Sequence, residues 1–191
     1  LRGLDGSPVF AQAGDGSPAP GGRGPVFTSF VAGILATLRE FSLLYAPNIN
    51  SYKRFQPGTF APTAVAWGED NRTCSIRVVG KGPALRMENR VPGGDVNPYL
   101  AVAGMLAGGL WGIEMELPLE APLVGNAYVA ERPRVPTTLR EARDAFANSV
   151  LARNAFGDDV VDHYVNAADV ELAAFESAVT DWERVRGFER L

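Results

Sequence analysis

The chain has 191 residues, of which 46% are hydrophobic and 21% are charged, and its formal net charge is −4 at pH 7. This composition is typical of a globular protein with a hydrophobic core, so we expect one domain or part of one. The negative net charge argues against general affinity for nucleic acid or for an anionic membrane, so positive side chains must act locally.

Cysteine and histidine each occur once, as Cys74 and His163. A single cysteine cannot form an internal disulfide, which favours a reducing cytoplasm, and metal centres built from several Cys or His side chains are excluded within these residues. No apolar run approaches the roughly 20 residues needed to span a bilayer. Because Leu1 is not an initiator methionine, we expect a processed or shortened chain.

The first part of the chain predicts a loop followed by a core helix. Residues 14–25 are rich in Gly, Pro and Ser, which predicts a mobile surface loop. A helical apolar pattern then begins near Thr28. Either Thr28 or Ser29 can cap the predicted helix, and Pro47 ends the apolar pattern. The apolar positions of this pattern are Phe30, Ile34, Leu38 and Phe41.

Three short strands are predicted next, at 64–67, 74–79 and 85–90, and an antiparallel sheet is their simplest assembly. Asn97 followed by Pro98 then predicts the capped start of a helix. This apolar helix, at 99–115, contains Gly104, Gly108 and Gly109, which indicate close packing of its backbone against a neighbour.

The last part of the chain predicts an extended surface loop at 117–136, which carries four prolines. Thr138 and Glu141 have the spacing of a helix capping box. Residues 159–186 show mostly helical apolar spacing and predict one long amphipathic helix. The predicted fold class is therefore α+β, with an antiparallel sheet packed against helices.

Arginines dominate the predicted strands. Within the strand at 85–90, Arg86, Glu88 and Arg90 alternate, so all three charges point to one face of the sheet. This ionic face either lines a binding cleft or is a solvated ion-pair network. Arg72 and Arg77 favour the cleft, because several guanidinium groups together suit anionic phosphates or carboxylates. A lone carboxylate there could hold Mg²⁺ together with phosphate oxygens.

A longer compound pattern extends through this region and resembles the catalytic domain of the glutamine synthetase family. The order and spacing match over more than fifty residues. The matching residues are Asn50-Ser-Tyr-Lys-Arg54, Pro57-Gly58, Ala61-Pro62, Trp67, Asn71-Arg72, Ile76-Arg77, Arg86-x-Glu88-x-Arg90 and Asn97-Pro98-Tyr99-Leu100.

This resemblance implies an ATP-dependent carbon–nitrogen ligase that uses Mg or Mn. Such an enzyme phosphorylates the γ-carboxylate of glutamate to γ-glutamyl phosphate, and an amine or ammonia then displaces phosphate. It also implies a ring-shaped homo-oligomer with active sites between neighbouring subunits. No nucleic acid and no membrane are expected as partners.

The resemblance assigns roles to matching positions. Arg54 and Arg90 resemble the glutamate-binding arginines, and Glu88 matches a metal-binding glutamate. Arg72 matches a catalytic position near the phosphoryl group that serves both substrate and nucleotide. Arg77 and Arg86 match positions that reach the phosphates of ATP.

Phe60 departs from the family pattern. Members that use ammonia usually carry a glutamate here, which helps to deprotonate ammonium, whereas an aromatic ring cannot accept a proton. The ring can instead form an apolar wall or face a cation, which favours a polyamine or similar alkyl amine as substrate, as in the glutamate–polyamine ligase branch. Ammonia remains the alternative acceptor, with Phe60 only packing a flap.

The resemblance covers only the C-terminal part of the family's catalytic domain. The N-terminal domain and the upstream catalytic half, which supply most metal ligands in the family, are absent from residues 1–191, so we expect this chain alone to be inactive. Two other readings stay open at this point. One is a catalytically silent structural member of the family, and the other is a surface ion-pair network without a ligand.

Overall fold

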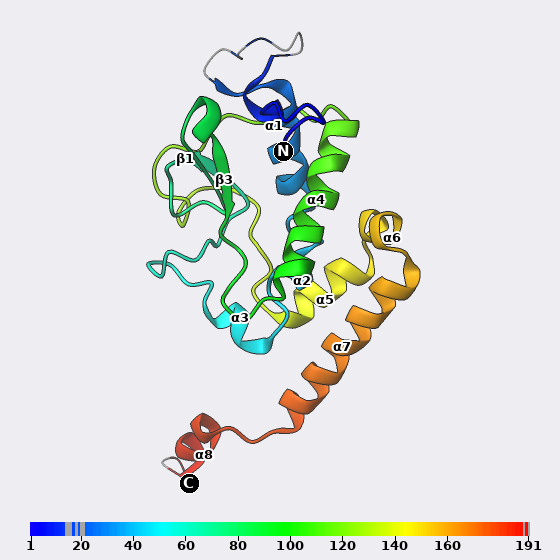
Figure 1. The fold of residues 1–191 in the computed structure, drawn as a ribbon. Helices are drawn as coiled ribbons and strands as arrows, with labels where there is room; N and C mark the ends of the chain where they lie inside the picture. Colours follow the sequence, from blue (N-terminus) through cyan, green and yellow to red (C-terminus); the bar gives the residue numbers. More distant parts are fainter. Residues whose placement is uncertain (14–16, 18, 20–21, 189, 191) are drawn as a thin grey trace.

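The computed structural model describes residues 1–13, 17, 19, 22–188 and 190. Helices and a small sheet form the body, and the last helix at the C-terminus lies apart from it (Figure 1). The α+β prediction is confirmed. Among the described residues, no helix is long and apolar enough to cross a membrane.

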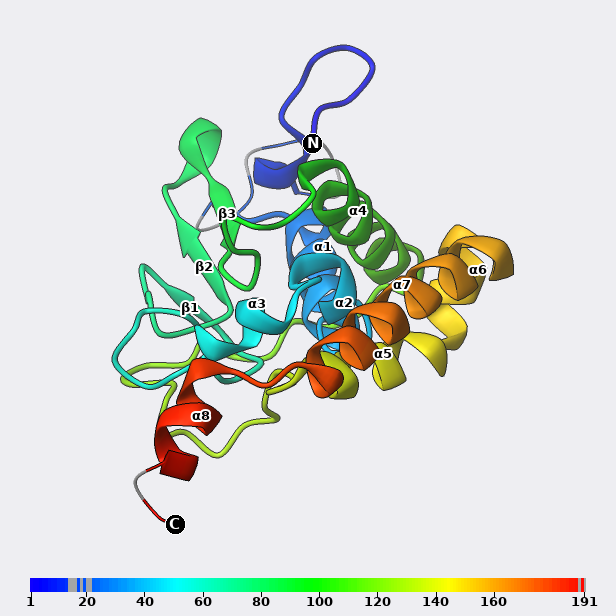
Figure 2. The same cartoon turned by 90° about the horizontal axis from the view of Figure 1, so that it is seen from below.

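Two long helices, α1 (Pro25–Thr37) and α4 (Pro98–Glu114), lie side by side and form the centre of the molecule (Figures 1 and 2). Their backbones approach closely where α1 contributes Gly33 and α4 contributes Gly108 and Gly112. A Cβ added to Gly33 would lie 2.1 Å from the Gly108 carbonyl oxygen. The predicted close packing of glycines in the second helix is thus confirmed.

The capped start of α4 is also confirmed, because the Asn97 side chain accepts a hydrogen bond from the backbone N–H of Tyr99 at 3.0 Å. The predicted start of the first helix is wrong. This helix begins at Pro25 rather than near Thr28, since proline is favoured at the first helical position. It ends at Thr37, and the remaining apolar residues continue into α2 (Ser42–Tyr45).

The predicted mobile loop at 14–25 falls partly on residues 14–16, 18, 20 and 21, which lie outside the described residues. The described part is attached to the body. Gly24 donates a backbone hydrogen bond to Phe10 at 2.8 Å, and Arg23 pairs with Glu69 at 2.8 Å.

The sheet has the order β1 (Trp67–Glu69), β2 (Ile76–Val79) and β3 (Arg86–Asn89). The antiparallel pairing holds for β2 and β3, whereas β1 and β2 are parallel. A six-residue connection returns the chain to the start of β1. Asn71 fixes this connection by donating hydrogen bonds to the carbonyls of Leu123 and Gly125, at 3.3 and 2.8 Å.

The two faces of the sheet differ as the alternation predicts. Ile76 and Val78 are buried in the hydrophobic core, while Arg86 and Glu88 are exposed. The segment 117–136 is extended, as predicted, and it runs beside the sheet region through hydrogen bonds such as Leu123 N–H to the Trp67 carbonyl, 2.8 Å. The sheet therefore presents its ionic face away from the helices.

Short helices complete the body: α3 (Ile49–Lys53), α5 (Leu139–Ala147) and α6 (Val150–Phe156). The predicted cap of α5 is confirmed, because Thr138 Oγ1 accepts from Glu141 N–H at 3.1 Å. The prediction of a single long C-terminal helix is wrong. The segment is divided into α7 (Asp158–Ser177) and α8 (Asp181–Phe188), because Thr180 caps a new helix and its N–H donates to the Glu183 carboxylate at 2.7 Å.

A substitution of Gly33 by alanine tests the close contact of α1 and α4. The added methyl would meet backbone atoms that cannot move separately, so we expect a loss of about 1–3 kcal/mol in the free energy of unfolding. Thermal unfolding of the complete protein measures it. The control is Gly187→Ala in α8, where a Cβ meets nothing within 4 Å. Equal midpoints for both variants would contradict the packing argument.

Candidate active site

The candidate site lies on the ionic face of the sheet. Arg77 on β2 stands directly opposite Glu88 on β3 in the antiparallel register. The Arg77 guanidinium donates to Glu88 Oε2 at 3.1 Å and, through Nε, to Asp70 Oδ1 at 2.9 Å. A row of alternating charges therefore begins at the edge of β1 and crosses the sheet.

Arg90 continues this row just beyond β3. Its Nη1 donates to Glu88 Oε1 at 3.0 Å, its Nε to the Arg72 carbonyl at 3.1 Å and its Nη2 to the Phe60 carbonyl at 2.9 Å. One guanidinium thus joins the strand, the connection between β1 and β2 and the loop before β1. Because its side chain is only 15% exposed, these bonds are partly shielded from solvent.

Glu88 is held by both neighbours. Partial burial raises the pKa of its carboxyl, but hydrogen bonds and positive charge from Arg77 and Arg90 outweigh burial and lower the pKa below its usual range. The carboxylate is therefore ionised at neutral pH, with each oxygen engaged by a different arginine.

Arg72 lies beside this row and lines an open cavity of about 560 Å³. Its guanidinium donates no hydrogen bond to any residue that the structure describes. Hydrogen bonding from Arg77 lowers the pKa of the Asp70 carboxyl, and the charge of Arg72 adds to this shift. The Arg72 cation is thus next to the ion-pair row yet available to a ligand. The cavity is lined by Phe60, Glu69, Asp70, Asn71, Arg72, Thr73, Pro122, Leu123, Val124 and Gly125.

Phe60 stands at this cavity with its side chain 58% exposed. Its backbone has φ of +59°, a left-handed conformation that is uncommon for an aromatic residue. Thr59 stabilises the same loop through a hydrogen bond from its hydroxyl to the Arg54 carbonyl, 2.9 Å. The Phe60 ring is therefore presented by a fixed turn whose carbonyl Arg90 holds.

Arg54 lies at the C-terminal cap of α3, outside the hydrogen-bonded row. Its Nη2 donates to the Val91 carbonyl, and its guanidinium carbon lies 5.1 Å from the centroid of the Phe55 ring. Burial lowers the pKa of Arg54, and the positive charge of Arg90 lowers it further, so the two arginines are electrostatic neighbours. The Nε of Arg54 is buried and has no partner among the described residues.

Arg86 does not join the row. It is exposed, and its only hydrogen bond to a described residue goes to the Ala84 carbonyl at 3.4 Å. It shares the face of Glu88 but lies at the opposite end of β3 from Arg90. The structure therefore brings together Phe60, Arg72, Arg77, Glu88 and Arg90, with Arg54 close by and Arg86 apart.

Two carboxylates of this region were missed by the sequence analysis. Asp70 pairs with Arg77, and Asp95 accepts hydrogen bonds from Ser51 and Asn48. The position of Asp70 directly before Asn71 and Arg72 was a possible signal, since it adds a negative charge to the arginine motif. Nothing in the local sequence links Asp95 to residues more than forty positions earlier.

Other reactive groups do not contribute a site. Burial raises the pKa of the Cys74 thiol to about 11, so this thiol is protonated and a poor nucleophile at neutral pH. His163 is exposed on α7. Within the described part of the chain, no group of three His, Cys, Asp or Glu side chains could hold a metal ion. Among the described residues, Glu88 would therefore be a lone carboxylate ligand and not part of a complete metal site.

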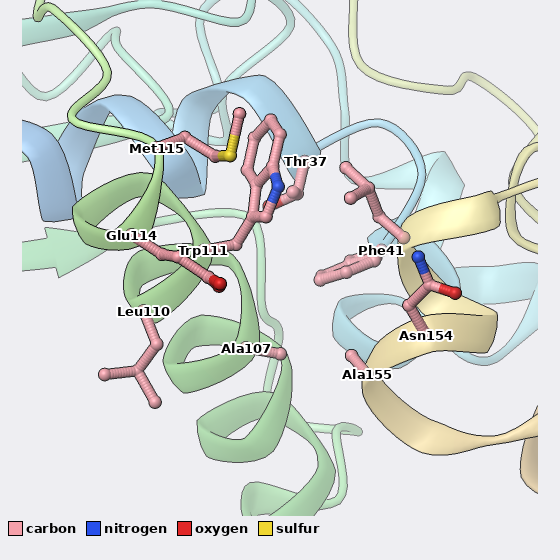
Figure 3. A pocket seen from close by; sticks show the side chains of 10 residues that line it. Thr37, Phe41, Ala107, Leu110, Trp111, Glu114, Met115, Asn154 and Ala155 are labelled. Atoms are coloured by element: carbon pink, nitrogen blue, oxygen red, sulfur yellow. The ribbon is translucent and has the colours of Figure 1, made fainter.

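A separate cavity of about 390 Å³ lies between α1, α4 and α6 (Figure 3). Trp111 and Met115 project from α4, and Asn154 lies opposite on α6. Its lining is mostly apolar and holds one titratable side chain, Glu114. None of the predicted site residues lines it, and it lacks the cations that an anionic substrate requires.

Comparisons with known proteins identify the family of the chain. A family model described as "Glutamine synthetase, catalytic domain" matches residues 1–186. The gamma-glutamylethanolamide synthetase GlnA4 of Streptomyces coelicolor is 67% identical over 171 residues, covering 90% of this chain and 37% of that protein. The glutamate–isopropylamine ligase of a Pseudomonas species is 42% identical over 191 residues, covering 97% and 40%.

Solved structures give the same result for the fold. One titled "GmaS/ADP complex-Conformation 1" has a TM-score of 0.84 and 26% sequence identity, and the match covers 97% of this chain and 44% of that chain. The chain therefore spans about two fifths of the length of the relatives that it matches.

Replacing Glu88 by glutamine tests the ion-pair row. Because the folded pKa of Glu88 is lowered, its contribution to stability is full above the ordinary value of 4.5 and is lost as the pH falls through the folded value. Wild-type stability should therefore fall more steeply below about pH 5 than that of Glu88→Gln. Urea unfolding across this range measures the slope. Identical slopes would contradict the argument, and Glu114→Gln serves as a remote control.

Proposed function

This chain belongs to the glutamine synthetase family, and from that premise we propose that it is the C-terminal part of the catalytic domain of a glutamate–amine ligase. The complete enzyme would join the γ-carboxylate of glutamate to an alkyl amine through γ-glutamyl phosphate, using ATP. The observation that carries this proposal is the row formed by Asp70, Arg77, Glu88 and Arg90, with the free guanidinium of Arg72 beside it.

The charge balance of this surface supports binding of anions. Arg72, Arg77 and Arg90 bring three guanidinium groups against two carboxylates, Asp70 and Glu88, so one positive charge remains without a partner among the described residues. Planar guanidinium groups bind phosphate and carboxylate oxygens in pairs. Since Arg77 and Arg90 are fixed by ion pairs, and Arg90 also by backbone carbonyls, these two guanidinium groups are oriented before a ligand arrives.

We assign the substrate contacts accordingly. Arg54 and Arg90 bind glutamate, and the partnerless Nε of Arg54 provides a buried donor for a carboxylate oxygen. Arg72 contacts the transferred phosphoryl group and stabilises the charge that develops on it. Arg77 holds the ATP phosphates. Arg86, which is exposed and apart from the row, would reach the nucleotide from the other end of β3.

ATP supplies the phosphoryl group that activates the γ-carboxylate, and the amine nitrogen then replaces phosphate at the acyl carbon, with loss of a proton from the amine. Family members use ATP and a divalent metal, and we propose Mg or Mn. Glu88 would be one metal ligand, but both of its oxygens already accept from arginines. Among the described residues, no group of three His, Cys, Asp or Glu side chains could hold the ion.

The acceptor amine would contact the side chain of Phe60. Its exposed ring lines the cavity beside Arg72 and offers an apolar wall to an alkyl group, whereas ammonia has no group to contact such a wall. The names of the ethanolamide-forming and isopropylamine-joining relatives support an alkyl amine. Ammonia remains the alternative acceptor, and a silent structural member is the alternative from outside enzyme chemistry.

We also propose that the complete enzyme works in the cytoplasm, where ATP is supplied, as a ring-shaped homo-oligomer with sites between subunits. The exposed arrangement of α8 supports contacts with further protein, because Trp182, Val185 and Phe188 are 68%, 58% and 80% exposed. Alone, residues 1–191 would be inactive, because Glu88 is the one metal ligand that we propose in the part of the chain that the structure describes.

Phosphate release by the complete protein tests this function. Mg²⁺, ATP and glutamate are supplied with ammonium, putrescine, spermine or ethanolamine added separately. We expect an alkyl amine to accelerate phosphate release more than ammonium does. Preference for ammonium would replace the proposal by an ordinary glutamine synthetase, and no stimulation by any amine would favour the silent structural member.

Substitution of Arg72 by alanine should lower kcat about 10²-fold or more, because the developing phosphoryl charge loses the cation that stabilises it. Steady-state phosphate release by the complete protein measures it. The matched control is Arg153→Ala, which removes an arginine that pairs with Asp158 and Asp162 far from the site. Turnover near wild type in Arg72→Ala would refute this role.

Phe60→Glu tests the acceptor preference. A carboxylate at this position can accept a proton from ammonium, so the ratio of kcat/KM for ammonium to that for the preferred alkyl amine should rise about tenfold or more. Phe60→Leu keeps an apolar wall and should leave the preference for alkyl amines in place. If the ratio is the same in all three proteins, Phe60 does not select the acceptor.

A further inference from the structure

Asp95 has no role in the site as described so far, yet it connects two segments that lie far apart in the sequence. Its Oδ2 accepts a hydrogen bond from the Ser51 hydroxyl at 2.6 Å and one from the Asn48 side-chain amide at 3.3 Å. Both donors belong to the start of α3. The carboxylate therefore ties the segment after β3 to the helix that precedes Arg54.

The start of α3 is arranged around these donors. Asn48 is the N-cap residue, and its backbone N–H donates to Ser51 Oγ at 3.1 Å. The Ser51 hydroxyl in turn donates a hydrogen bond to Asp95, so the helix cap and the carboxylate form one continuous network. A helix of five residues has little stability by itself, so its orientation depends on such external contacts.

The other end of α3 contacts the same segment. Arg54 is the C-cap residue of α3, and its Nη2 donates to the carbonyl of Val91. Gly93, between Val91 and Asp95, leaves just enough space, because a Cβ there would lie 3.4 Å from Arg54 Nε and 2.6 Å from Asp95 Oδ1. The segment 91–95 therefore holds α3 at both ends and lies against the guanidinium.

The charge of Asp95 also acts on Arg54. Burial lowers the pKa of Arg54, and the negative charge of Asp95 opposes that shift. For Asp95 itself, partial burial raises the pKa, but hydrogen bonds from Ser51 and Asn48 outweigh it, so the carboxyl remains ionised at neutral pH. Asp95 thus compensates part of the cost of placing a guanidinium in a partly buried position.

We propose that Asp95 is a positioning residue for Arg54, which acts through Ser51 and α3 to keep that guanidinium directed at the glutamate carboxylate. This inference rests on the proposed function, in which Arg54 binds glutamate. Asp95 makes no contact with the ion-pair row that we assign to the phosphoryl group. Its influence is therefore specific to one substrate, glutamate.

The substitution Asp95→Asn in the complete protein tests this inference. The side chain keeps its size, but the charge is lost and one of the two acceptor oxygens becomes an NH2 donor, so the remaining oxygen is a weaker, uncharged acceptor for Ser51 and Asn48. We expect the KM for glutamate to rise about tenfold, while kcat stays within about threefold and the KM for ATP is unchanged. A purely structural role would instead lower the thermal midpoint and affect both substrates.

A double-mutant cycle keeps the test independent of a single variant. Ser51→Ala removes the donor side of the same contact, so its effect on the glutamate KM should not add to that of Asp95→Asn. The control is Asp162→Asn, which removes a carboxylate paired with Arg153 and should leave both KM values unchanged.

Each outcome is decisive. A raised glutamate KM with a non-additive cycle supports the inference. An unchanged glutamate KM in Asp95→Asn, or additive effects, overturns it while leaving the proposed function intact. If the wild-type protein shows no glutamate-dependent phosphate release, the proposed function fails, and this inference fails with it.

Discussion

The guanidinium of Arg90 is the contact on which the candidate site depends. It reaches Glu88 on β3, the carbonyl of Arg72 in the connection between β1 and β2, and the carbonyl of Phe60 in the loop before β1. A lysine could not make the same contacts, because the three bonds come from three separate nitrogens, Nε, Nη1 and Nη2, whereas a lysine has one. The positions of the free cation and of the aromatic ring are therefore linked through one side chain.

The row that Arg90 completes is supported from beneath by the core. β2 buries Ile76 and Val78 against the helices, so the alternation of the strand directs Arg77 to the opposite face. The helices in turn are held by backbone contact at Gly33, where no side chain intervenes. Rigid packing on the core side of the sheet thus fixes the charged side chains on the opposite face. Fixed charges can stabilise a transition state without first having to reorient.

The sequence predicted those parts of the structure that depend on local pattern. The alternation of charges in the third strand and the cap formed by Asn97 depend on neighbouring residues, and both are present. The parallel direction of β1 could not be predicted, because it depends on the Asn71 side chain bonding to carbonyls about fifty residues later. The pairing of Asp70 and the separation of Arg86 depend likewise on how the strands meet.

The local charge of the site contrasts with that of the whole chain. The chain carries a formal net charge of −4, whereas the site holds an excess of guanidinium groups. At physiological ionic strength, fields decay over about 8 Å, so the acidic remainder neither repels nor attracts a substrate at long range. Recognition must then come from short contacts with fixed geometry. This requirement explains why nearly every arginine of the site is anchored to a carbonyl or a carboxylate, and why the one left free, Arg72, stands between two anchored segments.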